Sequence, residues 1–239
     1  MSLLTCREVK VRRGDKRARG RPREFDADKA LDRAMRVFWR KGFLGASLTD
    51  LTRAMRVSRP SLYAAFGDKE QLFRRALERY FEGPSSYAHE SLRAPTARAV
   101  VEKILYGAIN ILTGPGSPAT CMWVRCALSS GDGRLRGEFA AQRAEGHALL
   151  RKRFDRAVAT GDLPAGSHTD ALAHFVLTVN YGLTVQATTG ATRRDLERVA
   201  DSMLRDWPPP KSQQPMTGNR GSHRGDAAKQ RVRPSRRPP

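Results

Sequence analysis

The chain has 239 residues, of which 44 are Lys or Arg and 24 are Asp or Glu, so its formal net charge is +20. This length fits one or two domains with a sizeable hydrophobic core. No apolar stretch approaches the ~18 residues of a membrane-spanning helix, and the basic start lacks the apolar core of a secretory signal. We therefore expect a cytoplasmic protein. Three cysteines, an odd number, argue against a disulfide framework.

The positive charge is concentrated at the two ends of the chain. Residues 1–23 carry nine basic and two acidic side chains, and residues 208–239 carry eight basic and one acidic, which leaves +6 for residues 24–207. We interpret residues 1–23 as a flexible basic arm and residues 208–239, rich in Pro and Arg, as a disordered tail. This charge favours a nucleic-acid partner over an acidic membrane surface, and no membrane partner is expected.

Apolar residues recur at helical spacing throughout residues 24–207, and no strictly alternating run predicts a strand. Clear stripes are formed by Leu31, Ala34, Met35 and Phe38 near the start and by Leu196, Val199, Ala200 and Met203 near the end. Clusters of Gly and Pro divide the stripes into about nine helices. The sequence therefore predicts an all-α fold.

Two short helices are predicted near the start of the chain. Ser47 and Asp50 stand at the spacing of a capping box, which predicts a helix from Leu48 to about Met55. After a tight turn Ser58 caps the next helix, which carries Pro60 in its first turn. This helix-turn-helix is suited to the major groove of DNA, and the outward-facing side chains of its second helix are Arg59, Pro60, Ser61 and Tyr63.

A further helix begins after Gly67, where Asp68 and Gln71 repeat the capping spacing. Lys69 then lies at a helix N-terminus, where its charge opposes the helix dipole. A DNA phosphate at this place would explain the lysine. The alternative is an ordinary solvated side chain.

The segment from Gly20 to Phe81 resembles the DNA-binding domain of the TetR family of transcriptional regulators. The motifs that carry the resemblance are Ser47-Leu-Thr-Asp-Leu, Val57-Ser-Arg-Pro-Ser-Leu-Tyr-Ala-Ala-Phe and Gly67-Asp-Lys-Glu. The resemblance implies a homodimer with a three-helix DNA-binding domain at residues 24–82 and a helical ligand-binding and dimerisation domain at residues 84–207. It further implies a repressor that a small-molecule effector releases from a palindromic operator, with no cofactor.

The resemblance also implies roles for individual residues. Ser47 and Thr49 correspond to phosphate contacts, Lys69 corresponds to a phosphate clamp, and Arg21 and Arg23 lie in an arm that reaches a minor groove or phosphate. The recognition surface comprises Arg59, Pro60, Ser61 and Tyr63. Arg56 departs from the family, which usually has glycine in this turn; if its φ is positive, the side chain costs on the order of 1 kcal/mol.

The second half of the chain offers candidates for an apolar effector pocket, with ordinary core residues as the alternative. The candidates are Tyr106, Cys121, Met122, Trp123, Phe175 and Tyr181. Cys121 begins a predicted helix, so a partly acidified, redox-active thiol is a further alternative. The last two helices, at about residues 169–189 and 194–206, carry apolar stripes that equally suit an intramolecular core, and the family resemblance implies that they form a four-helix dimer interface.

Two other functions compete with that of a regulator. No nucleophile elbow, phosphate loop or paired acidic site is present, so no enzymatic activity is expected. His147 and His174 are separated in the sequence and lack a Cys or carboxylate at ligand spacing, so no metal site is expected. A non-specific nucleic-acid packaging protein driven by its basic arms remains the alternative to a sequence-specific regulator.

Overall fold

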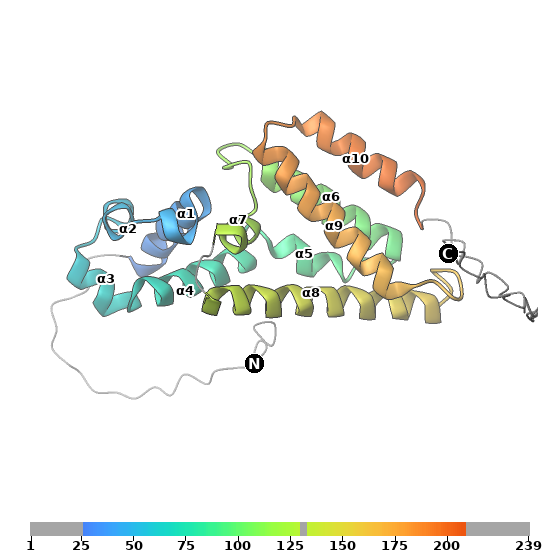
Figure 1. The fold of residues 1–239 in the computed structure, drawn as a ribbon, viewed down its shortest axis with the longest axis horizontal. Helices are drawn as coiled ribbons and strands as arrows, with labels where there is room; N and C mark the ends of the chain where they lie inside the picture. Colours follow the sequence, from blue (N-terminus) through green and yellow to red (C-terminus); the bar gives the residue numbers. More distant parts are fainter. Residues whose placement is uncertain (1–25, 130–132, 209–239) are drawn as a thin grey trace, which may run out of the picture. The chain divides into compact units, whose positions relative to one another are not determined.

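The computed structural model describes residues 26–129 and 133–208, which form ten helices and no strand (Figure 1). The all-α prediction is confirmed, with one helix more than the nine expected. The helices are α1 Ala27–Gly45, α2 Leu48–Met55, α3 Arg59–Phe66, α4 Lys69–Glu82, α5 Ser86–Ser91, α6 Ala97–Thr113, α7 Met122–Ser129, α8 Gly133–Ala159, α9 Thr169–Thr188 and α10 Arg193–Arg205. The additional helix is the six-residue α5, which is too short to show a hydrophobic stripe.

Two sequence predictions fall outside these residues. The basic arm at residues 1–23, with Arg21 and Arg23, is outside the described residues, and so is the predicted tail apart from Pro208. Within the described part of the chain, no helix is both long and apolar enough to span a membrane.

The apolar faces of α1 to α4 form a hydrophobic core that we call the N-terminal cluster. Phe38 of α1 is fully buried, and its ring centroid lies 5.1 Å from that of Phe73 on α4. Met122 and Cys126 of α7 and Phe139 of α8 complete the same cluster. Residues from the segment predicted as the C-terminal domain therefore belong to the core of the first four helices.

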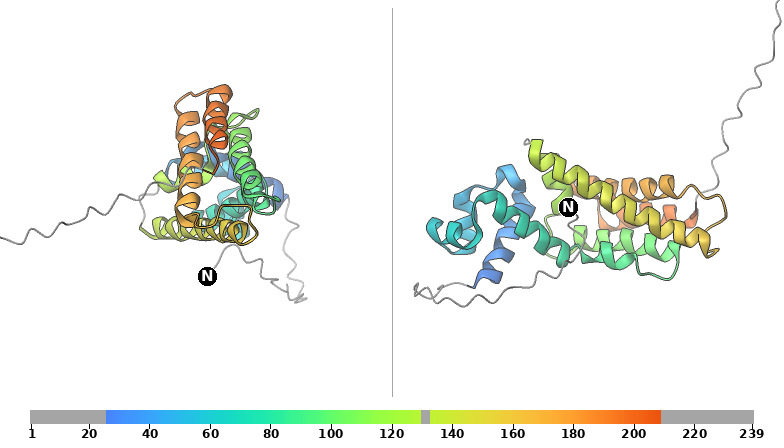
Figure 2. Two further views of the ribbon diagram at one scale, coloured as in Figure 1. Left: turned by 90° about the vertical axis from the view of Figure 1, so that its right-hand side faces the viewer. Right: turned by 90° about the horizontal axis from the view of Figure 1, so that it is seen from below.

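A second core, the C-terminal cluster, joins α6, α8, α9 and α10. Phe154 of α8 is fully buried, and its ring centroid lies 5.6 Å from that of Trp207, which follows α10. The start of α8 contributes to the N-terminal cluster and its second half to the C-terminal cluster, and Figure 2 shows this long helix passing beside both groups of helices. This one helix therefore connects the two cores.

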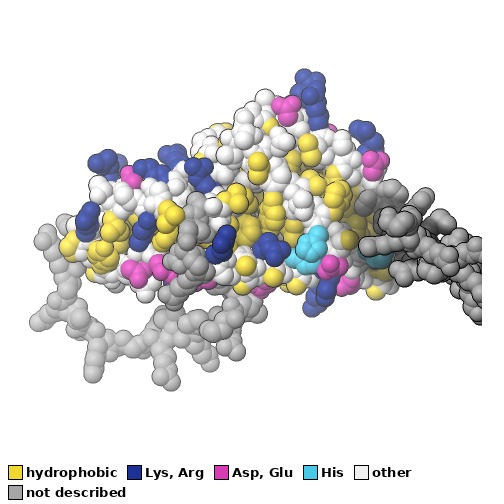
Figure 3. Space-filling view, in the orientation of Figure 1, with side chains coloured by type: hydrophobic (Ala, Val, Ile, Leu, Met, Phe, Trp, Pro, Cys, Tyr) yellow, Lys and Arg dark blue, Asp and Glu magenta, His cyan; other side chains and the backbone are white. Residues whose placement is uncertain are grey.

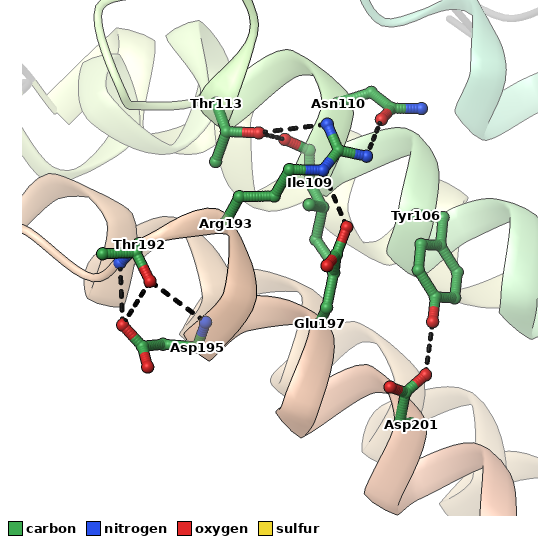
Figure 4. Close-up of polar contacts among 9 residues, drawn as sticks. All are labelled: Tyr106, Ile109, Asn110, Thr113, Thr192, Arg193, Asp195, Glu197 and Asp201. Atoms are coloured by element: carbon green, nitrogen blue, oxygen red, sulfur yellow. Dashed lines mark hydrogen bonds and ion pairs between the residues drawn. The ribbon is translucent and has the colours of Figure 1, made fainter.

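Polar contacts fasten α10 to α6 (Figure 4). Arg193 donates hydrogen bonds to the Asn110 side chain at 2.8 Å and to the Thr113 hydroxyl at 3.5 Å. About one turn before Asn110 on α6, the Tyr106 hydroxyl donates to the carboxylate of Asp201 on α10. Tyr106 thus points toward α10, and its hydrogen bond to Asp201 raises the pKa of its hydroxyl to about 12.

Candidate nucleic-acid interface

The start of α2 is fixed by the predicted capping box. The Ser47 hydroxyl accepts a hydrogen bond from the Asp50 amide at 3.0 Å, and the Ser47 amide donates to the Asp50 carboxylate at 3.1 Å. Lys41 of α1 lies 2.7 Å from the same carboxylate, and this contact holds the pKa of Asp50 well below its usual range. Sequence reasoning missed Lys41, because no local pattern joins residues nine positions apart on different helices.

Arg56, in the turn between α2 and α3, adopts a backbone conformation that is unfavourable for any residue except glycine. Its φ of 60° and ψ of 44° are left-handed, and the following amide, that of Val57, donates to the Thr52 carbonyl at 3.1 Å. A side chain in this region costs about 1 kcal/mol relative to glycine. The Arg56 side chain is exposed beside α2 and α3.

One face of α3 is buried and the other is open. The Ser58 hydroxyl caps the helix by accepting from the Ser61 amide at 3.2 Å, while Leu62 and Phe66 anchor it in the N-terminal cluster. Arg59, Pro60 and Tyr63 are exposed, and Tyr63 retains 47% of its accessible surface. The local cap and the two buried side chains therefore hold a short helix with Arg59, Pro60 and Tyr63 exposed on its outer side.

Two residues predicted to contact DNA meet across the turn. The Arg59 guanidinium donates to the Thr49 hydroxyl at 3.1 Å, so α2 and α3 share one exposed polar surface. Ser61 is half-buried, and its hydroxyl lies 2.8 Å from that of Ser58. A phosphate bound here is able to accept from Arg59 and Thr49 together.

Lys69 at the start of α4 is half-buried, unlike a solvated lysine. Its ammonium lies 4.6 Å from the centroid of the Phe43 ring, and desolvation lowers its pKa. Asp68 and Gln71 form the predicted capping box at this helix start. A partly desolvated cation at the N-terminus of a helix favours an anion at this place.

Sequence reasoning also missed a row of cations on α1. Arg33, Arg36 and Arg40 line a shallow depression between α1 and α2 together with Lys41. Figure 3 shows Lys and Arg side chains gathered over the N-terminal helices. The three arginines are spaced by three and four residues, which places them on one face of the helix. This spacing is the sequence pattern from which the row could have been predicted.

Three of the predicted effector residues come together. The rings of Trp123 on α7 and Tyr181 on α9 stack with centroids 5.5 Å apart, and the Tyr80 hydroxyl of α4 donates to the Cys121 sulfur at 3.4 Å. Burial raises the pKa of Tyr181 to about 12 and also raises the pKa of the Cys121 thiol. The alternative of an acidified Cys121 thiol is therefore opposite in direction to this shift, because desolvation outweighs the effect of the helix start.

The other candidates lie elsewhere. Tyr106 bonds to α10, Phe175 is 43% exposed on α9, and Met122 is fully buried in the N-terminal cluster. Around Cys121 the structure instead places residues that the sequence did not indicate. Gln142 of α8 accepts from the Trp123 indole at 2.8 Å, and burial beside Cys121 raises the pKa of Tyr87.

Comparisons with known proteins agree with this arrangement. Residues 30–76 match the family model described as bacterial regulatory proteins, tetR family. The chain is 33% identical over 198 residues to the HTH-type transcriptional repressor ComR of Escherichia coli (strain K12), covering 81% of this chain and 94% of ComR. It is 32% identical over 187 residues to the uncharacterized HTH-type transcriptional regulator YezE of Bacillus subtilis (strain 168), covering 76% of this chain and 94% of YezE.

A solved structure matches this chain at a higher sequence identity than these two relatives. The chain is similar to a cysteine mutant of the TetR family transcriptional regulator CifR in complex with a 26-bp double-strand operator DNA. The identity is 44% and the TM-score is 0.74, covering 79% of this chain and all of the CifR chain.

Proposed function

Because the chain belongs to the TetR family of transcriptional regulators, we propose that it is a repressor that inserts α3 into the major groove of its own operator. The observation that carries the proposal is the two-sided build of α3, with Leu62 and Phe66 buried and Arg59 and Tyr63 exposed. A guanidinium and a phenol on the open side are able to reach base edges while Thr49 and Lys69 reach phosphates.

Two copies of the chain are needed to read a palindrome. Three exposed large hydrophobic side chains, Phe175, Val185 and Val199, lie on α9 and α10. These two helices pack against each other and supply an apolar face for a four-helix interface with a second copy. In sedimentation analysis we expect the wild type to be a dimer and Phe175→Glu to shift it toward a monomer; an unchanged dimer in this variant would place the interface elsewhere.

Operator binding is tested by fluorescence anisotropy with DNA from the chain's own upstream region and a scrambled control at ~150 mM salt. We expect at least ~100-fold preference for one palindromic site, and Tyr63→Ala and Arg59→Ala should remove most of it. Arg156→Ala is the matched control, because it deletes an exposed arginine on α8, far along the chain.

The same experiment separates the competing function. A packaging protein would bind both DNAs equally, would not respond to Tyr63→Ala, and would lose most of its affinity when residues 208–239 are deleted. A repressor keeps its operator preference after that deletion. Equal binding of the two DNAs by the wild type would contradict our proposal.

The effector site is proposed at the aromatic group around Cys121, Trp123 and Tyr181. Asn180, next to Tyr181, has a buried side-chain oxygen without a hydrogen-bond partner among the described residues, and this supports a polar ligand contact. A compound that releases the wild type from its operator should lose its effect on Tyr181→Ala. If that variant responds at the same concentration as the wild type, the effector binds elsewhere.

A further inference from the structure

Two histidines and a carboxylate meet where α8 packs against α9. His147 lies on α8, and Asp170 and His174 lie one turn apart on α9. The carboxylate oxygens of Asp170 are 3.6 Å from Nε2 of His147 and 3.9 Å from Nε2 of His174. One ligand atom from each residue lies within 4.8 Å of the other two. From the sequence we expected no metal site, on the premise that these histidines have no carboxylate at ligand spacing. That premise is wrong: Asp170 is four residues before His174, and the fold brings His147 to both.

The chemistry of the three side chains suits a divalent transition metal. Two imidazoles and one carboxylate form a donor set that Zn²⁺, Ni²⁺ and Co²⁺ accept, whereas Ca²⁺ and Mg²⁺ prefer oxygen donors alone. Donor atoms about 2.0–2.1 Å from a tetrahedral ion lie ~3.3 Å apart, so no pair of donor atoms has to approach by more than ~1.5 Å. Asp170 and His174 have exposed side chains, so these are the two ligands that would rotate to bring the donor atoms together.

The burial of the three residues fits an anchored but open site. The His147 side chain is 13% exposed and held between helices, while those of Asp170 and His174 are 60% and 57% exposed. Three protein ligands leave at least one coordination position for water, which is the arrangement of exchangeable and catalytic sites rather than of closed structural ones. Histidine side chains are visible on the surface in Figure 3.

Ordinary polar contacts account for only part of the group, in which Nε2 of His147 also lies 3.3 Å from the backbone carbonyl oxygen of Asp170. Asp170 already has a cationic partner in Arg151, whose Nη1 lies 3.7 Å from its carboxylate. The two imidazole rings lie against each other with centroids 3.9 Å apart at an interplanar angle of 30°. Two rings in contact beside one carboxylate are not needed for charge balance there, but they bring two nitrogen donors to one place.

We propose that His147, Asp170 and His174 bind a divalent transition-metal ion, with water in the remaining coordination positions. The bound ion replaces Arg151 as the counter-charge of Asp170 and links α8 to α9. This proposal is independent of operator binding, because none of the three residues lies on the helices that face DNA.

The test uses the full chain without an affinity tag, freed of metal by a chelator that is then removed. Zn²⁺ is titrated by calorimetry and Co²⁺ by its visible absorption. We expect one ion per chain and a rise in the melting temperature with Zn²⁺, since an ion that binds only the folded state stabilises it. Asp170→Asn and His174→Gln change exposed side chains, so they should fold, and each should weaken binding at least ~10-fold.

His89→Gln on α5 is the matched control, since it removes a histidine outside the group and should bind metal like the wild type. Metal-induced stabilisation should survive in His89→Gln and disappear in His174→Gln. The proposal fails if the wild type binds neither ion, or if His174→Gln and Asp170→Asn bind with wild-type affinity, because the metal then sits on other groups such as the thiols.

Discussion

The surface of α2 and α3 and the aromatic group around Cys121 are organised over very different lengths of chain. In the first, Ser47, Ser58 and Asp68 each cap a helix by bonding to the residue three positions ahead. In the second, Tyr80, Trp123 and Tyr181 come from α4, α7 and α9 and meet through ring stacking and through hydrogen bonds between residues far apart in the chain. Local hydrogen bonds thus position the side chains proposed to read DNA, while distant contacts position those proposed to sense an effector.

The largest effects should come from emptying either core. Phe38→Ala in the N-terminal cluster and Phe154→Ala in the C-terminal cluster each remove a fully buried ring. Each should lower the free energy of unfolding by about 3–5 kcal/mol, measured by urea denaturation followed by circular dichroism. Leu44→Ala, at a residue 57% exposed, should stay within about 0.5 kcal/mol of the wild type. A loss below ~1 kcal/mol in Phe38→Ala would refute the packing described for α1.

Met122 lies in the second half of the chain but packs with helices of the first half. Met122→Ala should cost about 2–5 kcal/mol and increase hydrogen exchange in peptides of residues 26–82. Met203→Ala empties the C-terminal cluster instead, so it should increase exchange chiefly in α6, α9 and α10. Faster exchange confined to α7 in Met122→Ala would show that α7 does not stabilise α1 to α4.

Arg56 tests how much strain the turn between α2 and α3 contains. Arg56→Gly relieves the left-handed backbone and should raise the free energy of unfolding by up to about 1 kcal/mol, less the larger chain entropy of glycine. Arg56→Ala deletes the same charge but keeps the strain, so it should not be stabilised. Both variants should bind DNA equally in anisotropy measurements. A gain in stability for the alanine variant would mean that charge repulsion, rather than backbone strain, is relieved.

The smallest expected change in stability is that of Asp50→Asn, and it depends on pH. Its pKa in the folded protein lies below its ordinary value of 3.8, chiefly because of Lys41, so its contribution to stability is complete above that value. The contribution is lost as the pH falls toward the lower, folded-state pKa. The stability difference between the wild type and Asp50→Asn should therefore be constant from pH 7 to 5 and shrink below pH 4. Lys41→Met should reduce this pH dependence but not remove it, because the Ser47 hydroxyl and amide also lower the pKa of Asp50. A stability difference that grows in acid would contradict the lowered pKa of Asp50.

The sequence predicted the all-α fold, the bounds of α2 and α3, and three helix caps, because each depends on residues within one or two turns of one another. It did not predict that Lys41 pairs with Asp50, that Phe43 lies under Lys69, or that Tyr106 turns to Asp201. Those contacts depend on how helices pack, which short-range spacing does not encode. The missed grouping of His147 with Asp170 and His174 has the same origin.

The place of α7 has a consequence for the order in which the chain acquires its structure during synthesis. The first four helices end at Glu82, but Met122, Cys126 and Phe139, which complete their core, are translated some 40 to 57 residues later. Synthesis at ~5–20 residues per second makes this gap several seconds, while local helices form in about a microsecond. Part of the apolar face of nascent α1 to α4 therefore stays exposed during these seconds. These helices reach their final stability only when α7 and the start of α8 have emerged from the ribosome.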